Sequence, residues 1–138
     1  MAAGLGKRMR SKLAKVLHTV AGRPMILYAV DLAKRLAECG VAVVVGYQGD
    51  RVKSVVQGYA GTDLRLVEQA QQLGTGHAVM QARTALLRAH GLPADTYVIL
   101  NGDTPLLTED TVRALVRLHE TEKATVTILT TILHDPSG

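Results

Sequence analysis

The chain has 138 residues, of which 47% are hydrophobic and 20% charged, with a formal net charge of +4. This composition fits one folded domain and argues against a disordered chain. The sequence contains no Phe and no Trp, and its aromatic residues are four tyrosines. A protein that stacks single-stranded bases on aromatic side chains is therefore disfavoured.

Cysteine content and hydropathy indicate where the protein acts. Its single cysteine, Cys39, cannot form an intramolecular disulfide, which fits a reducing compartment. No apolar run approaches the roughly 20 residues that span a bilayer, and the basic residues near Met1 precede no signal-peptide core. We therefore expect a cytoplasmic protein that does not bind membranes.

The chain begins with a basic segment that contains two glycines, Gly4 and Gly6. Such a pair allows a tight turn whose backbone N–H groups point at phosphate oxygens. The first 24 residues include six basic side chains and no acidic one, and Arg8 and Lys15 are suited to neutralise an anion. The spacing fits neither a Walker A loop nor a complete dinucleotide fingerprint. A plain surface turn remains the alternative at this point.

Helical and strand-like patterns then alternate along the chain. The β-branched run over 41–45 predicts a strand buried on both faces, as in a parallel sheet. Strands alternating with helices predict an α/β fold, a Rossmann-like, mostly parallel sheet with flanking helices. In chain order we expect a helix from Pro24 that ends before Gly40, strand 41–45, a short helix over 50–56, strand 64–67, helix 78–89, strand 97–100, a helix capped by Thr108, and strand 125–132.

A polar loop follows strand 64–67 and opens helix 78–89. Its glutamines Gln69 and Gln72 each offer a donor and an acceptor on one amide, which complements the edge of a pyrimidine base. Gly74 permits close backbone approach, and the helix start near Thr75 favours an anion. A polar loop that only starts a helix explains the same residues equally well.

Asp103 comes directly after strand 97–100, in the run Asn101-Gly102-Asp103. Open α/β sheets bind ligands at the carboxyl ends of their strands. Mg²⁺ needs few protein carboxylates, because water and substrate phosphates complete its coordination shell. We interpret Asp103 as a magnesium ligand, and its alternative role is to start a turn. No nucleophile–histidine pair indicates covalent catalysis.

Both ends of the sequence are typical of a fragment. The residues before Gly4 are fewer than in the strand that normally precedes a phosphate-binding loop, and residues 135–138 form a turn-like cluster with nothing after it. We therefore expect a sheet that is incomplete at both ends, within a single nucleotide-binding portion over residues 1–138.

Segments 2–9, 15–25, 72–78 and 102–106 share a pattern with a known family. In order and spacing they resemble the uridylyltransferase part of the bacterial bifunctional N-acetylglucosamine-1-phosphate uridylyltransferase / glucosamine-1-phosphate N-acetyltransferase. The resemblance runs along the whole chain but covers only the start of the family protein. It implies a glycosyltransferase-A-like fold. It also places the sugar-binding half and the β-helix acetyltransferase domain outside these 138 residues.

The resemblance implies a Mg²⁺-dependent transfer of uridylyl from UTP to N-acetylglucosamine-1-phosphate, which yields UDP-N-acetylglucosamine and pyrophosphate. We expect the chain alone to be inactive or nearly so, and the full-length family protein to be a homo-oligomer with no nucleic-acid partner. The implied catalytic residues are Arg8, Lys15 and Asp103, and Asp103 is the metal ligand. The implied nucleotide-binding residues are Ala2, Ala3, Gly4, Gly6, Arg8, Lys15, Gln69, Gln72, Gly74 and Thr75, and the substrate-binding residues are Asn101 and Gly102.

The sequence departs from the family pattern at three positions. Ala14 stands where a proline usually precedes the motif lysine, Lys15, and a proline would stiffen the backbone there. Lys7 replaces a common Thr, and Asn101 replaces a common aromatic residue. These departures affect the placement of Lys15 and a packing contact near the sugar.

Three other functions account for part of the same pattern. A related cytidylyl-, guanylyl- or thymidylyltransferase would share the glycine loop and Asp103, although the segment Gln72-Leu73-Gly74-Thr75-Gly76-His77-Ala78 argues against it. A non-catalytic nucleotide-binding fragment would bind UTP without releasing pyrophosphate. A nucleic-acid-binding protein rests only on the basic first segment, and it predicts an affinity that falls steeply with salt.

Overall fold

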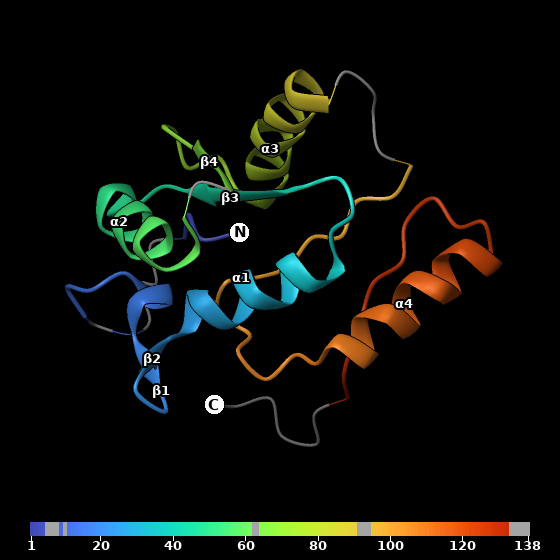
Figure 1. The fold of residues 1–138 in the computed structure, drawn as a ribbon, viewed down its shortest axis with the longest axis horizontal. Coiled ribbons are helices and arrows are strands. Elements are labelled where there is room, and N and C mark those ends of the chain that lie inside the picture. The colour runs from blue at the N-terminus through green and yellow to red at the C-terminus, as the bar shows by residue number, and fades with distance from the viewer. Residues whose placement is uncertain (5–8, 10, 62–63, 91–94, 133–138) are drawn as a thin grey trace. The chain divides into compact units, whose positions relative to one another are not determined.

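The computed structural model describes residues 1–4, 9, 11–61, 64–90 and 95–132 (Figure 1). Its contacts form two compact units, Met1–Leu107 and Thr108–Gly138. Whether the chain is a single nucleotide-binding portion stays a prediction. The elements of the first unit are the 3-10 helix η2 (Lys15–Leu17), strands β1 (Thr19–Val20), β2 (Arg23–Pro24), β3 (Val41–Val45) and β4 (Leu64–Glu68), and helices α1 (Met25–Leu36), α2 (Gly49–Ala60) and α3 (Thr75–His90).

Strands β3 and β4 form a parallel pair, in register from Val41 opposite Leu64 to Val45 opposite Glu68. Helix α2 lies between them in the sequence, as the predicted alternation requires. The predicted strands over 41–45 and 64–67 are therefore confirmed. The three predicted helices of this unit are present as well, although α2 continues to Ala60.

Alternate residues of β3 face two different layers. Val43 and Val45 join a core with side chains of α1 and α2, whereas Val44 packs with Ala78 of α3. Figure 1 shows α1 and α3 on opposite sides of β3. Because successive side chains of a strand point to opposite faces, the uninterrupted apolar run of β3 supplies both layers. This three-layer α/β arrangement agrees with the predicted burial on both faces.

The first three residues of the chain add a further parallel segment beside β3. The N–H of Ala2 donates to the carbonyl of Val44 at 2.8 Å. On the other side, the Met1 ammonium donates to the Leu100 carbonyl at 2.5 Å, and the Gly102 N–H donates to the Met1 carbonyl at 2.9 Å. These are the slanted bonds of parallel neighbours. The carboxyl ends of all four segments therefore lie along one edge, called here the carboxyl edge.

Two predicted strands are not formed. Residues 97–100 form no strand, although the Leu100 carbonyl accepts from the Met1 ammonium. Residues 125–132 also form no strand, and Val126, Ile128 and Ile132 are exposed. A segment of high β-propensity becomes a strand only where another segment pairs with it. Within the described ranges, no segment pairs with 125–132.

No sequence pattern predicts the antiparallel hairpin of β1 and β2, which leads into α1. Its two turn residues, Ala21 and Gly22, have φ values of 49° and 76°. Two successive positive φ angles define the turn that matches the twist of a two-residue hairpin. The hairpin places Arg23 beside α1.

Arg23 connects this hairpin to α1 and α2. Its guanidinium donates to Asp31 Oδ2 at 2.6 Å and to the Tyr59 hydroxyl at 2.7 Å, and it lies over the rings of Tyr28 and Tyr59. Burial by itself raises the pKa of Asp31, but the hydrogen bonds from Arg23 and Tyr59 and the positive charge nearby hold that pKa below its ordinary value.

The second unit contains helix α4 (Glu109–Thr121). Its predicted cap is confirmed, since Thr108 Oγ1 accepts a hydrogen bond from the Thr111 N–H at 3.3 Å. Glu109 and Asp110 in the first turn complement the helix dipole. Across the residues that the structure describes, no helix is long and apolar enough to cross a membrane.

The Asp31 cluster predicts a loss of stability in acid. A group whose pKa is lowered by folding stabilises the fold above its unfolded-state pKa, near 3.8 for Asp31, and this stabilisation is lost as the pH falls through the folded-state pKa. Asp31→Asn should lower the free energy of unfolding by about 1–2 kcal/mol at pH 7. Urea unfolding along a pH series should show that deficit shrinking below the ordinary pKa.

Asp95→Asn is a matched control, because Asp95 is exposed and its substitution should leave the unfolding curve unchanged at pH 7. A deficit for Asp31→Asn that stays constant down to the lowest pH would contradict the role of the carboxylate charge.

Candidate functional site

The described residues that were predicted to bind nucleotide lie at the carboxyl edge or next to it. Gln69 follows β4, and its N–H donates to the Val45 carbonyl at 2.8 Å. Ala3 leads from the first segment into Gly4, and Asp103 follows the residues that pair with Met1. Ligands of open α/β sheets bind at this edge. The roles of the individual residues stay predictions.

The start of the glycine loop is anchored by burial. Ala2 and Ala3 are buried at 3% and 7% exposure, while Gly4 is exposed. The chain therefore passes from buried to exposed between Ala3 and Gly4. Gly6 and Arg8, which were predicted to hold phosphates, lie outside the described residues.

Two glycines allow the backbone to approach closely around this first segment. A Cβ on Gly46 would lie 2.9 Å from the Ala3 carbonyl oxygen. A Cβ on Gly102 would lie 2.8 Å from Ile26 Cδ1 and 3.0 Å from the Met1 carbonyl oxygen. Gly102 is buried and its N–H is already bonded to Met1. Its predicted contact with substrate would therefore have to use another atom, and packing alone explains why a glycine stands here.

Lys15 and Asp103 meet across this edge. Lys15 Nζ lies 2.6 Å from Asp103 Oδ2, with 39% of the lysine side chain and 32% of the aspartate side chain exposed. The next two residues of η2, Val16 and Leu17, are buried and anchor the lysine backbone. Partly exposed ion pairs add little stability. The Lys15–Asp103 pair therefore orients the two side chains more than it stabilises the fold. These are the two charges that were predicted to bind phosphate and metal.

Gln69 is the buried polar residue of the second loop, with 4% exposure. Its amide nitrogen, Nε2, donates to the Gly74 carbonyl at 3.0 Å and lies 3.0 Å from Nδ1 of His77. Gly74 has a φ of 95°, a conformation that favours glycine. Gln72 is exposed, and Thr75, also exposed, is the first residue of α3.

These contacts fix which way the Gln69 amide faces. A carbonyl oxygen only accepts, so the atom beside Gly74 must be the amide nitrogen. The second hydrogen of that nitrogen points at Nδ1 of His77, which therefore acts as an acceptor. The side-chain amide of Gln81 lies 3.1 Å from the other ring nitrogen of His77. Both hydrogens of Gln69 Nε2 are thus used inside the loop, and Oε1 is left as the atom that can accept from a ligand.

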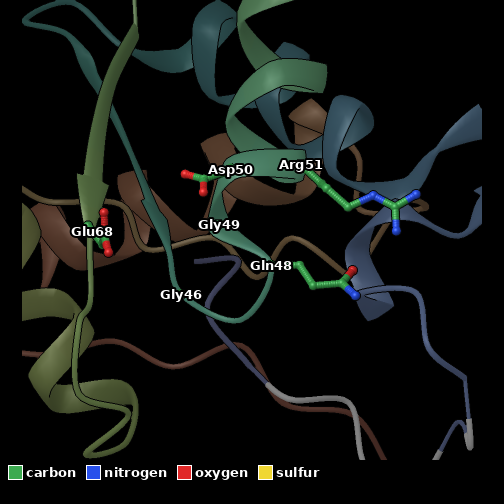
Figure 2. A pocket seen from close by; sticks show the side chains of 6 residues that line it. All are labelled: Gly46, Gln48, Gly49, Asp50, Arg51 and Glu68. Carbon is green, nitrogen blue, oxygen red and sulfur yellow. The ribbon is translucent and has the colours of Figure 1, made fainter.

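A hollow of about 340 Å³ lies beside these residues, at the ends of β3 and β4. Figure 2 shows Asp50 and Glu68 on one side of it, and Gln48 and Arg51 on the other. Lys53 Nζ lies 2.8 Å from Glu68 Oε2 and 3.6 Å from Asp50 Oδ1, so both acidic side chains already have a cationic partner. None of the predicted site residues lines this hollow.

The sequence interpretation missed one residue that contacts the site loops, Gln48. For His77 it favoured an orienting or structural hydrogen bond over a ligand contact, and His77 Nδ1 lies 3.0 Å from Gln69 Nε2. Gln48 reaches back to the segment before Lys15 from the start of α2. No periodicity or motif indicates such a contact between residues more than thirty positions apart.

Comparison with known proteins identifies the family. Residues 1–133 match the family described as the MobA-like NTP transferase domain. The chain belongs to this family. It is 46% identical over 138 residues to the bifunctional protein GlmU of Fervidobacterium nodosum, and 44% identical to the GlmU of Halalkalibacterium halodurans. Each alignment covers 100% of this chain but only 28% and 29% of those proteins. The chain therefore spans less than a third of these relatives.

Gly102→Ala tests the packing at the carboxyl edge. The added methyl group would overlap Ile26 and the Met1 carbonyl, and overpacking of this kind costs about 1–3 kcal/mol. We expect a lower urea midpoint with an unchanged slope. Gly58→Ala is the matched control, since a Cβ on Gly58 meets no atom within 4 Å. Equal stability of the two variants would contradict the close approach at Gly102.

Proposed function

We propose that this chain is the nucleotide-binding part of an enzyme that transfers uridylyl from UTP to N-acetylglucosamine-1-phosphate. The products are UDP-N-acetylglucosamine and pyrophosphate. The family match over residues 1–133 and the similarity to the GlmU proteins support this assignment. The same relation supports a glycosyltransferase-A-like sheet. We propose that the complete reaction needs a longer protein than these 138 residues.

The observation that carries the proposal is the Lys15–Asp103 ion pair at the carboxyl edge. It joins Lys15 of the basic first segment to the Asp103 carboxylate, on the side of the sheet where Gly4 becomes exposed. Nucleotidyl transfer needs a cation for the phosphates and a carboxylate for a divalent metal at adjacent positions. These two charges have that arrangement.

Lys15, Gly4, Gly6 and Arg8 are proposed to bind the triphosphate. The backbone N–H groups of a glycine turn suit phosphate oxygens, and Arg8 would add bidentate contacts. Without nucleotide, Lys15 is held by Asp103. A bound phosphate would offer the ammonium a second anionic partner, and the carboxylate could then share its charge with a metal ion.

The residues present fit a magnesium ion held largely by its substrate. Asp103 is half-buried at the edge, with its Oδ2 beside Lys15. In the described part of the chain, no group of three His, Cys, Asp or Glu side chains forms a complete protein cage. Mg²⁺ commonly takes one or two carboxylates and completes its shell with water and phosphates. When bound it would neutralise charge on the phosphates, and Asp103 would hold it.

Uracil is proposed to bind against the Gln69–Gly74 loop, with Gln72 and Thr75 alongside. Gln69 Nε2 is used by Gly74 and His77, so Oε1 is the amide atom left to accept from a ligand. An acceptor complements the N3–H of uracil and opposes N3 of cytosine, which has no hydrogen. Left unpaired, such a buried acceptor costs about 1–3 kcal/mol. The loop therefore favours uracil over cytosine.

The chemical step is an in-line displacement at the α-phosphorus of UTP. An oxygen of the sugar phosphate forms the new P–O bond, and the bond to the β-phosphate oxygen breaks to release pyrophosphate. The attacking phosphate is already ionised, so no general base is required, and catalysis rests on position and charge stabilisation. Lys15, Arg8 and Asp103 would supply these, with Asn101 and Gly102 near the sugar phosphate.

Calorimetry with UTP and Mg²⁺ tests the nucleotide site. Asp103→Ala and Gln69→Ala should each weaken UTP binding about tenfold, because hydrogen bonds of charged or buried groups contribute about 1–3 kcal/mol. Asp95→Ala and Gln57→Ala are matched controls at exposed positions and should bind as the wild type does. CTP and GTP should bind more weakly than UTP. Equal binding of all three nucleotides would overturn the uracil assignment.

His77 gives a second, independent test of the base-binding loop. His77→Leu removes the acceptor that faces Gln69 Nε2, so the amide can turn and the preference for UTP over CTP should fall about five- to tenfold. His77→Asn keeps an acceptor near the position of Nδ1 and should retain more of the preference. The ratio of the two affinities is the measurement, and an unchanged ratio in His77→Leu would contradict this role.

A further inference from the structure

Gln48 makes two hydrogen bonds to the backbone of the segment before Lys15. Its Oε1 accepts from the Ala14 N–H at 2.9 Å, and its Nε2 donates to the Lys12 carbonyl at 2.5 Å. One amide thus satisfies a donor and an acceptor two residues apart, as a neighbouring strand would. These residues lie 34 and 36 positions from Gln48 in the sequence.

The backbone of Gln48 is itself held by hydrogen bonds. Its carbonyl accepts from the N–H groups of Arg51 and Val52 at 3.0 and 3.2 Å, so it is part of the first turn of α2. Gln48 has a φ of 53° and a ψ of 34°, the left-handed region that residues with a side chain rarely adopt. Glycine or asparagine would suit this backbone better, so the side chain is what distinguishes glutamine here.

Ala14 explains why such a contact is needed. A proline at this position would have no N–H and a fixed φ. Ala14 has a φ of −54°, which a proline can adopt, but it is buried and carries an N–H. A buried N–H without an acceptor destabilises the folded state. Gln48 Oε1 supplies that acceptor and restrains the same backbone.

We propose that Gln48 is a positioning residue for Lys15. By holding the backbone of Lys12 and Ala14, it sets where η2 begins and so where Lys15 Nζ lies beside Asp103. The lysine side chain is 39% exposed, so its own packing does not fix it. The inference rests on the proposed role of Lys15 in phosphate binding, and it adds a residue outside the phosphate loop that prepares the lysine for its ligand.

The test compares four chains: wild type, Gln48→Leu, Ala14→Pro and the double variant. Leucine is similar in size to glutamine but makes no hydrogen bond. Gln48→Leu should speed hydrogen exchange at the Ala14 amide about tenfold and weaken binding of UTP with Mg²⁺ by a similar factor, as expected for the loss of hydrogen bonds to buried groups. In the double variant the proline removes the donor, and UTP affinity should recover by at least half of the logarithmic loss.

Two controls separate positioning from folding. Gln57→Leu makes the same change at an exposed position of α2 and should leave both readouts unchanged. If Gln48→Leu proves poorly folded by circular dichroism, Gln48→Glu takes its place. Glutamate keeps the acceptor for Ala14 and loses the donor to Lys12, so exchange at Ala14 should stay slow while UTP affinity falls less than tenfold.

The outcomes are distinct. Slow exchange at Ala14 in Gln48→Leu, or UTP affinity that Ala14→Pro does not restore, would overturn the positioning role. A wild-type chain that binds no UTP would overturn the proposed function of this chain. The exchange rate at Ala14 would then still decide whether Gln48 holds this backbone.

Discussion

The site depends on backbone pairing between the first three residues and their two neighbours. Ala2 bonds to Val44 on one side, and Met1 bonds to Leu100 and Gly102 on the other. This pairing carries the start of the glycine loop to the edge where the other parallel segments end. It also holds Gly102, and so the adjacent Asp103, beside that first segment. Small residues make the approach possible, because side chains at Gly46 and Gly102 would collide with this segment.

Side-chain contacts to the backbone then set the loops at that edge. Gln69 bonds to the Gly74 carbonyl within its own loop, whereas Gln48 bonds to a segment that lies far away in the sequence. In both cases a side-chain amide bonds to backbone groups of a neighbouring loop. Such contacts are directional, so they orient the remaining polar atoms as well. For Gln69 they leave Oε1 as the amide atom that can accept a further hydrogen bond.

The elements that local patterns determine were predicted correctly. The apolar run of β3 forces burial on both faces, and the Thr108 side chain caps α4 within three residues of itself. The strands expected over 97–100 and 125–132 were wrong, because strand formation depends on a partner that the sequence of the segment does not contain. The hairpin after η2 was missed, since Ala21 gives no sign of the positive φ that its turn requires.

The site likewise combines features that local sequence determines with features that depend on the folded chain. Residue types predicted that a lysine, a carboxylate and an amide bind nucleotide, and the fold brings Lys15 into contact with Asp103. The role of Gln48 could not be predicted from the sequence, because the N–H that it bonds becomes buried only when the chain folds. Ala14, unlike a proline, carries an N–H, and a buried N–H must find an acceptor. The acceptor comes from whichever residue the fold places opposite, here Gln48. A departure from a family motif is therefore best judged by asking which backbone group it adds or removes, and what satisfies that group.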